Sequence, residues 1–206
     1  MANSFGGLGS ITDMWLREPN WVKNLNEKGV VSRTLLQFFG TSQILYTENP
    51  EVPVEVKMMF MNRTKAQEYE FLSFFSTQQG RLKKYWLPEW KNRFKLTRTA
   101  NSGESFIYVQ NRKHAVAFQA YQRIYLLLHT GEWVTRQIAS ITEIDATEEK
   151  INLVTTLDRT ISAASVSQSG LFLLVRMAVE KIYVEHETIN VSIFSIESRE
   201  LIREYP

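Results

Sequence analysis

Short apolar or alternating runs, separated by polar turns, fill the chain from residue 106 almost to its C-terminus. The runs are residues 106–109, 115–118, 123–129, 133–144, 151–154, 171–175, 181–186 and 189–193. Polar turns are predicted at residues 110–113, 130–132 and 146–150. Strands of this length at short, regular spacing are typical of antiparallel sandwiches and barrels. We therefore predict an antiparallel β-sandwich or barrel-like lobe over residues 105–206.

Residues 20–98 mix strand and helix signals, which predicts an α+β lobe. Its clearest strand is residues 54–60, where Glu55 and Lys57 alternate with the apolar residues Val54, Val56, Met58 and Phe60. Alternation with a period of two puts the apolar set on one face of a strand. We expect this strand in an N-terminal sheet. A polar stretch at residues 99–104 is the predicted boundary between the lobes, and the predicted class is mainly β (α+β).

One amphipathic helix is predicted at about residues 64–78. Thr64 and Gln67 have the spacing of a capping box, in which each side chain satisfies an unpaired amide at a helix start. Apolar residues then recur at helical spacing, and we expect them to pack on the sheet: Ala66, Tyr69, Leu72 and Phe75. Gly80 is expected to end the helix in a left-handed conformation.

We predict an extended N-terminal arm at residues 1–19, because glycines and small polar residues surround isolated larger side chains there. The larger side chains are Phe5, Met14 and Trp15. A frayed terminus is an equally good interpretation, because chain ends are poorly ordered unless other parts of the fold hold them.

Residues suited to catalysis or metal binding are sparse. The chain has no cysteine, which excludes disulfides, thiolate metal sites and cysteine nucleophiles. No two of its histidines, His114, His129 and His186, stand at metal-ligand spacing, and no G-x-S-x-G motif occurs. We therefore predict a protein that is not an enzyme, with no catalytic residues, no metal and no cofactor.

The chain ends and the apolar runs argue against a membrane protein. The first residues lack the basic start and apolar run of a secretory signal. No apolar run approaches the roughly 20 residues that a membrane helix needs. We expect no membrane segment, and the lack of cysteine is compatible with assembly in a reducing cytoplasm.

The most unusual stretch is residues 81–98, where basic and aromatic residues are interleaved. Glu89 is its only acid among seven basic residues, Arg81, Lys83, Lys84, Lys91, Arg93, Lys95 and Arg98. Its aromatic residues are Tyr85, Trp86, Trp90 and Phe94. Single-stranded nucleic-acid grooves combine these residue types, although the net charge of +2 does not require such a partner.

Three other interpretations of residues 81–98 remain. The aromatic residues are equally suited to a core beneath one solvated strand face. They are also the residue types that dominate contacts between subunits. A carbohydrate-binding sandwich, with Trp86 or Trp90 stacked on a sugar, is a weaker hypothesis. The sequence does not choose among these alternatives.

Several segments together resemble a tail protein family of long-tailed phages and prophages. They are Phe-Leu-Ser-Phe-Phe at 71–75, Gly80-Arg81, Tyr-Trp-Leu-Pro-Glu-Trp at 85–90, Pro-Asn-Trp at 19–21, Leu-Phe-Leu-Leu-Val-Arg at 171–176 and Arg-Glu-Leu at 199–201. In that family a helix ending in Gly-Arg leads into an aromatic Trp-Leu-Pro-x-Trp segment and a basic strand. Lys83 and Lys84 depart from the pattern, because smaller or apolar residues are usual there.

The resemblance implies a structural virion protein of the tail tip or baseplate, assembled in the host cytoplasm. The expected role is a distal-tail-like ring subunit, a hub-associated baseplate protein or an adaptor. The expected partners are further copies of the chain and other tail proteins (tail tube, hub or adaptor). Residues 5–15 become a candidate arm that reaches an adjacent subunit.

The resemblance also suggests roles for single residues. Gly80 and Pro88 are expected to form structural turns, and Trp86, Pro88 and Trp90 to fix a sheet edge. The candidate assembly contacts are Phe5, Trp15, Arg81, Tyr85, Trp86, Trp90 and Arg93.

Overall fold

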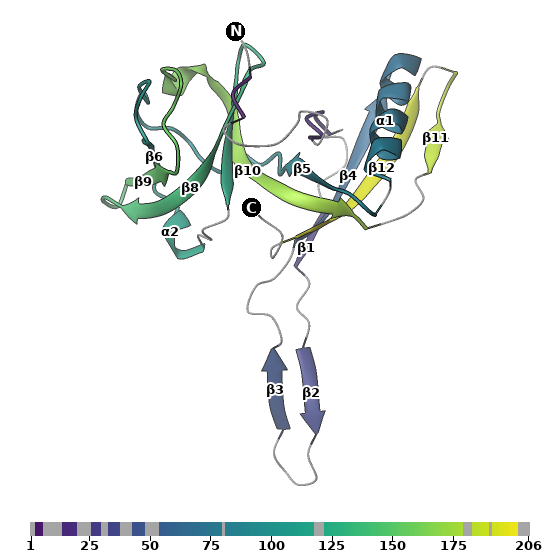
Figure 1. Cartoon of the computed structure of the whole chain (residues 1–206), viewed down its shortest axis with the longest axis horizontal. Helices are drawn as coiled ribbons and strands as arrows, with labels where there is room; N and C mark the ends of the chain where they lie inside the picture. Colours follow the sequence, from purple (N-terminus) through teal and green to yellow (C-terminus); the bar gives the residue numbers. More distant parts are fainter. Residues whose placement is uncertain are drawn as a thin grey trace. The chain divides into compact units, whose positions relative to one another are not determined.

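A computed structural model describes residues 3–5, 14–19, 26–29, 33–37, 43–47, 54–79, 81–117, 122–178, 183–189 and 191–201. The chain divides into two units, each assembled from segments that are distant in sequence. Unit 1 comprises Met1–Leu16 and Trp86–Leu173, and unit 2 comprises Arg17–Tyr85 and Leu174–Tyr205. Figure 1 shows the elements of both units, coloured along the chain.

The described elements are predominantly strands in antiparallel pairs, which confirms the predicted mainly β class. None of the helices among these residues is long and apolar enough to cross a bilayer. The helices are α1 (Lys65–Gln78), α2 (His114–Ala117) and the 3-10 turn η2 (Ala163–Ser165). The strands are β1 (Asn26–Gly29), β2 (Arg33–Gln37), β3 (Gln43–Thr47), β4 (Val54–Asn62), β5 (Lys84–Pro88), β6 (Phe106–Gln110), β7 (Arg123–Leu128), β8 (Trp133–Glu143), β9 (Glu148–Leu153), β10 (Val166–Met177), β11 (Val184–His186) and β12 (Ser192–Glu200).

The unit division differs from the boundary predicted at residues 99–104. That stretch is a turn inside unit 1, where Ala100 pairs with Ile161 and the Gly103 amide donates to the Leu157 carbonyl at 2.8 Å. Polar composition marks a turn at the surface. The boundaries of the units depend on pairing between strands that are distant in sequence, and local composition does not predict that pairing.

The sheet of unit 2 has β12 at its centre. β4 covers one edge of β12, and β11 and the end of β10 share the other edge. β1 pairs with the free edge of β4, and β2 and β3 form a separate two-stranded sheet. The register places Phe60 opposite Phe194 and Met58 opposite Ile196, and each of these side chains is at most 1% exposed. Lys57 is exposed between the buried Val56 and Met58, so the predicted alternation is confirmed over residues 56–60.

Helix α1 begins and ends through local hydrogen bonds. The Thr64 hydroxyl accepts from the Gln67 amide at 3.3 Å, and the Gln67 side chain accepts from the Arg63 amide at 2.8 Å. The predicted cap is therefore present, although Gln67 reaches one residue further back than a capping box requires. The left-handed residue after the helix is Gln79, with φ 52° and ψ 41°. The prediction had assigned that role to Gly80, which lies outside the described residues.

The buried face of α1 is not the predicted one. Phe71 is fully buried and stacks on Phe194 with 3.4 Å between ring centroids, and Phe74 meets Tyr85 edge-on at 5.2 Å. The face expected to be buried is largely turned outward, with Tyr69 68% and Leu72 40% exposed. The helix carries apolar residues on two faces. The face with Phe71 and Phe74 is the one that packs on the unit, because its burial removes more apolar surface from water.

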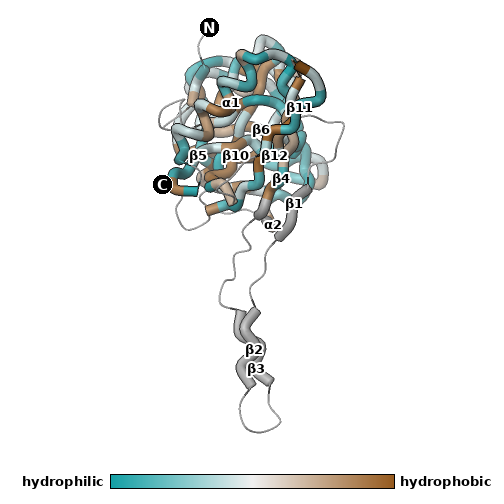
Figure 2. The backbone as a smooth tube through the Cα atoms, turned by 90° about the vertical axis from the view of Figure 1, so that its right-hand side faces the viewer, coloured by the Kyte–Doolittle hydropathy of each residue, from teal (hydrophilic) through white to brown (hydrophobic). Residues whose placement is uncertain are grey.

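The sheet of unit 1 has the strand order β10-β7-β8-β9-β6. These strands do not close into a barrel among the described residues. Residues 93–97 hydrogen bond to both end strands: the Arg93 amide donates to Ser169 of β10 at 2.9 Å, and the Thr97 amide donates to Tyr108 of β6 at 3.0 Å. The apolar run at residues 171–175 of β10 is brown in Figure 2, and each residue is at most 7% exposed.

Three sequence predictions in unit 1 were wrong. Residues 115–118 were expected to form a strand, but α2 covers most of them, so the chain has a second helix. The alternation of Phe94 and Leu96 with Arg93, Lys95 and Thr97 also predicts a strand. This stretch instead forms an isolated bridge, between Leu96 and Val109. The turn predicted at 146–150 is shorter, because β9 begins at Glu148. Apolar runs of about four residues do not distinguish a strand from a helical turn.

A buried carboxylate connects α2 to β9. The Glu149 side chain is fully buried and lies 2.5 Å from Nδ1 of His114, while Nε2 of His114 lies 3.2 Å from the Arg93 carbonyl. Burial alone raises the pKa of Glu149. Hydrogen bonds from the His114 ring and from the amides of Ala115, His114 and Arg112 outweigh it, so the pKa lies below its ordinary 4.5.

This pair predicts an acid-sensitive contribution to stability. Because the folded pKa of Glu149 is lowered, the unfolded chain takes up a proton at a higher pH than the folded chain. The contribution is complete above the ordinary carboxyl pKa and is lost as pH falls through the folded value. We expect Glu149→Gln to reduce the change in unfolding free energy between pH 6 and pH 3, measured by urea titration. An unchanged pH dependence would contradict this, and the exposed Glu187→Gln is the control.

Candidate functional site

The aromatic residues of the segment 81–98 are core residues. Tyr85 is fully buried in unit 2, and its hydroxyl lies 2.6 Å from that of Ser198. In unit 1, Trp86, Trp90 and Phe94 are 6%, 4% and 2% exposed. Side chains buried to this degree have no free ring face for a base or a sugar. The core interpretation therefore describes them best in this structure.

Arg93 and Arg98 of this segment make ion pairs. Arg93 donates two hydrogen bonds of 2.8 Å to Glu89, and Arg98 donates to Glu148 of β9. Arg98 also lies over the Tyr108 ring at 4.3 Å. Arg81, Lys83 and Lys84 are exposed in unit 2, and Lys91 and Lys95 are exposed in unit 1. Glu148 is thus an acidic partner for Arg98 that lies outside the segment 81–98 and could not be identified from that segment.

Glu89 and Trp90 fix the path of the chain after β5. The sequence predicts a short strand at residues 85–87 that Pro88 stops, and β5 ends at Pro88. The Glu89 carboxylate is 2% exposed and accepts from the Leu171 amide at 2.9 Å. Trp90 has a positive φ of 56°, which is unfavourable for a residue with a side chain. Its ring packs edge-on against Trp133, with centroids 5.6 Å apart, and this burial offsets the backbone strain.

The best-defined contact built from separate parts of the chain is the docking of the N-terminal arm on β8. Ser4 forms a parallel bridge with Val134. The Ser4 amide donates to the Trp133 carbonyl at 2.8 Å, and the Thr135 amide donates to the Ser4 carbonyl at 2.8 Å. The Asn3 side chain accepts from the Trp133 amide at 3.0 Å. The arm thus adds a short strand to a part of β8 that β9 leaves uncovered, since β9 pairs from Ile138 onward.

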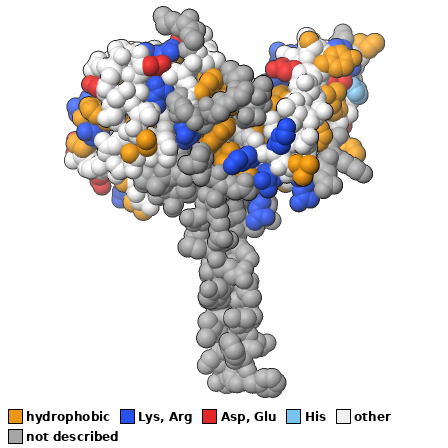
Figure 3. All heavy atoms as spheres, viewed as in Figure 1, with side chains coloured by type: hydrophobic (Ala, Val, Ile, Leu, Met, Phe, Trp, Pro, Cys, Tyr) orange, Lys and Arg blue, Asp and Glu red, His pale blue; other side chains and the backbone are white. Residues whose placement is uncertain are grey.

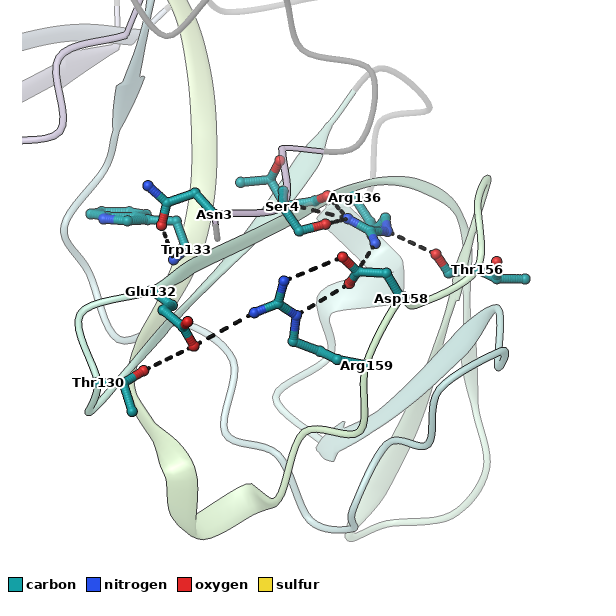
Figure 4. Close-up of polar contacts among 10 residues, drawn as sticks. Asn3, Ser4, Thr130, Glu132, Trp133, Arg136, Thr156, Asp158 and Arg159 are labelled. Carbon is teal, nitrogen blue, oxygen red and sulfur yellow. Dashed lines mark hydrogen bonds and ion pairs between the residues drawn. The ribbon is translucent and has the colours of Figure 1, made fainter. Parts of the chain in front are cut away.

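A buried arginine organises the side chains at this contact (Figure 4). Arg136 is 4% exposed and donates to the Ser4 hydroxyl at 2.9 Å, the Thr156 carbonyl at 2.9 Å and Asp158 at 3.1 Å. Burial alone raises the pKa of Asp158. Hydrogen bonds from Arg159 and Ser4 and the charges of Arg159 and Arg136 lower the pKa by more than burial raises it, so the pKa lies below its ordinary value. Ser4 therefore contacts both members of an ion pair.

A second ion-pair link extends this cluster. Arg159 lies 3.3 Å from Asp158 and 3.5 Å from Glu132, and Glu132 accepts from the Thr130 hydroxyl at 3.1 Å. Figure 4 shows these side chains converging from the β7–β8 turn and the loop after β9. We call the set Asn3, Ser4, Glu132, Arg136, Asp158 and Arg159 the arm-docking cluster.

The arm makes a second contact with unit 1. Met14 forms a parallel bridge with Trp86, and the Trp15 amide donates to the Trp86 carbonyl at 3.0 Å. Met14 and Trp15 are 5% and 3% exposed. The described arm residues are thus held by the same chain, and Phe5 is half-buried beside Ser4.

Of the residues proposed as contacts, Trp15, Tyr85, Trp86 and Trp90 are buried, Phe5 and Arg93 are half-buried, and Arg81 is exposed. The structure does not bring all of them to one surface. Sequence reasoning missed Arg136, Asp158 and Ser4. The one available signal was Arg136 itself, a charge inside the run of residues 133–138, which implied a partner for a buried cation.

Among the described residues, no group of three or more His, Asp or Glu side chains is placed to hold a metal ion. Comparison with protein-family models and with curated proteins found no match to this chain.

Proposed function

We propose that the chain is a structural protein of a phage tail tip or baseplate that acts by associating with further copies and with other tail proteins. The outward face of α1 is the observation that carries this proposal. Tyr69 and Leu72 have the spacing of a buried helix face, yet they are 68% and 40% exposed. Exposed apolar residues gathered at one place are typical of protein contact surfaces.

Two further large apolar residues are exposed in unit 2. Tyr183 and Ile189, on either side of β11, are 79% and 84% exposed. β11 and α1 are adjacent, because Glu68 of α1 accepts from Ser192 and lies 3.8 Å from His186. Figure 3 shows hydrophobic side chains on the surface over this end of unit 2.

The charges on α1 favour a second copy of the chain as the occupant of this face. Lys65 and Glu70 flank Tyr69 on the exposed side of the helix, and Lys65 lies 3.2 Å from Glu68 of the same helix. If two α1 helices pair in antiparallel fashion about a point between Gln67 and Glu68, each Lys65 faces the other Glu70 and each Ala66 faces the other Tyr69. Such a face is self-complementary, as contacts related by a two-fold axis require.

The segment that resembles tail proteins supports the class of function. Its aromatic residues are core residues of the units to which they belong, and Glu89 and Arg93 form an ion pair within unit 1. A resemblance carried by framework residues is expected for proteins that share a structural role.

Light scattering on the full chain tests the proposal. We expect a mass that is a multiple of 24.0 kDa, and Tyr69→Glu is expected to lower it by placing a charge in the contact. Val154→Glu makes a comparable change at a side chain 55% exposed in unit 1 and is expected to leave the mass unchanged. A wild-type mass of 24.0 kDa at all concentrations would count against self-association.

Among the residues that the structure describes, no contact favours the alternative binding module for nucleic acid or carbohydrate. It requires exposed rings beside the basic residues, and Trp86 and Trp90 are both buried.

A further inference from the structure

We propose that the edge of β8, together with Arg136 and Asp158, also accepts residues 3–5 of a second copy, so that neighbouring subunits exchange their N-terminal arms. The inference rests on the proposed self-association and names a contact and an occupant for it. Its basis is the geometry of the arm, its buried partner Arg136 and the composition of the intervening chain.

The β8 edge is built to receive a strand. Without the arm, the amides of Trp133 and Thr135 and the carbonyl of Trp133 lose the partners described above. Unpaired backbone groups at a sheet edge favour pairing with an added strand, which is how many chains join neighbouring subunits.

Arg136 makes the site selective for a small polar residue at the position of Ser4. The guanidinium is 4% exposed and retains Thr156 and Asp158 as partners, but Ser4 supplies two further acceptors, its hydroxyl at 2.9 Å and its carbonyl at 3.4 Å. A larger side chain at that position would fill the space of these contacts. Asn3 adds selectivity, because its side chain accepts from the Trp133 amide. The arm of a second copy carries both residues at the required spacing.

The arm is weakly held by side-chain packing, so its own docking site is open to competition. Asn3 is exposed, and Ser4 and Phe5 are only half-buried. Residues 6–13, between the two contacts of the arm, contain Gly6, Gly7 and Gly9. Fully extended, the chain from Phe5 to Met14 spans about 30 Å at most, which is enough to reach a neighbour in contact.

Exchange uses the same hydrogen bonds as docking within one chain, so it leaves no site empty in a closed assembly. Swapping an identical element between subunits is a low-cost route to association for this reason. Within an assembly, a neighbouring arm has an effective concentration of the order of millimolar, which competes with the chain's own arm.

The absence of cysteine from the chain allows a direct test by disulfide formation. Ser4 and Val134 are paired in a parallel bridge, so small movements of the arm bring their Cβ atoms to the separation of about 3.5–4.5 Å that a disulfide needs. Full-length Ser4→Cys and Val134→Cys chains are mixed under native conditions, oxidised and separated on a non-reducing gel. Exchange predicts a disulfide-linked dimer from the mixture and none from either variant alone.

A single chain that carries both substitutions supplies the comparison. If the doubly substituted chain links only internally and the mixture gives no dimer, arm exchange is overturned. Light scattering on the same samples separates the two proposals: a multimeric mass without interchain links leaves self-association intact, whereas a 24.0 kDa mass removes both.

A second variant avoids any substitution in the core. Ser4→Pro removes the amide donor and the hydroxyl of Ser4 while changing only the arm. Exchange predicts that this variant dissociates to the 24.0 kDa chain at a higher protein concentration than the wild type, because one of its two contacts is lost. Equal dissociation of the two chains on dilution would refute a contribution of exchanged arms.

Discussion

Gly170→Ala is expected to destabilise the folded chain by about 3 kcal/mol, a large fraction of the stability of a domain of this size. A Cβ at this position would lie 2.7 Å from the Lys91 carbonyl oxygen, 2.9 Å from a Tyr125 ring carbon and 3.0 Å from the Glu89 carboxylate. The nearest atom belongs to the backbone and cannot rotate away. Relief therefore requires β10 to separate from residues 89–91, which would disturb the Glu89 hydrogen bond to Leu171. Urea unfolding measures the effect as a lower midpoint.

Gly103→Ala provides the matched comparison. Gly103 has a positive φ of 85°, but a Cβ there would meet nothing within 4 Å. The expected loss is about 1–2 kcal/mol, from the left-handed backbone alone. If the free energy of unfolding falls by the same amount in both variants, crowding at Gly170 does not cause the loss.

Arg93→Met is expected to cost about 3 kcal/mol because it leaves the Glu89 carboxylate buried without its cation. The Glu89 side chain is 3% exposed in this pair, whereas that of Arg93 is 37% exposed. The two partners are therefore unequal. Glu89→Gln removes the charge, keeps an acceptor for the Leu171 amide, and leaves an arginine that water can reach. We expect a smaller loss, about 1 kcal/mol.

The asymmetry predicts a rescue. Arg93→Met leaves the Glu89 charge without its partner, and Glu89→Gln removes that charge. The double variant should therefore be more stable than Arg93→Met alone. A thermodynamic cycle from urea unfolding of the four chains measures this coupling. Lys95→Met is the control for loss of a basic residue from an exposed position, with an expected change within about 0.5 kcal/mol. Additive effects would show that the pair does not act as a unit.

The sequence was informative wherever one local pattern determined one structure. The alternation at residues 54–60 predicted β4 because each side of that strand has a distinct environment. The Thr64 cap was predictable because its hydrogen bond spans three residues. Pro88 was a reliable strand end because it lacks an amide donor.

The sequence was less informative where two patterns competed. Helix α1 carries Tyr69 and Leu72 on one face and Phe71 and Phe74 on another, and tertiary packing chose the second. The four apolar residues 115–118 are too few to define a period. The interleaved aromatic and basic residues at 81–98 resembled a binding groove, although a partly buried segment produces the same alternation.

The arm-docking cluster was beyond local inference because its members are far apart in the chain. Ser4 and Arg136 are 132 residues apart. Only the charge of Arg136 inside an apolar strand indicated that a partner must exist. Nothing in its neighbourhood identified that partner as the N-terminal arm.

The segmented construction of unit 2 determines when it can form during synthesis. β4 pairs with β12, and Asn62 and Ser192 at one end of this ladder are 130 residues apart. At ordinary rates of translation, that interval takes on the order of 10 s. Throughout it, the apolar face of β4 and the Phe71 side of α1 lack the strand that covers them. The nascent chain therefore exposes an apolar surface until β12 has left the ribosome. A chain truncated just before Ser192 would lack β12, so that surface would stay exposed permanently.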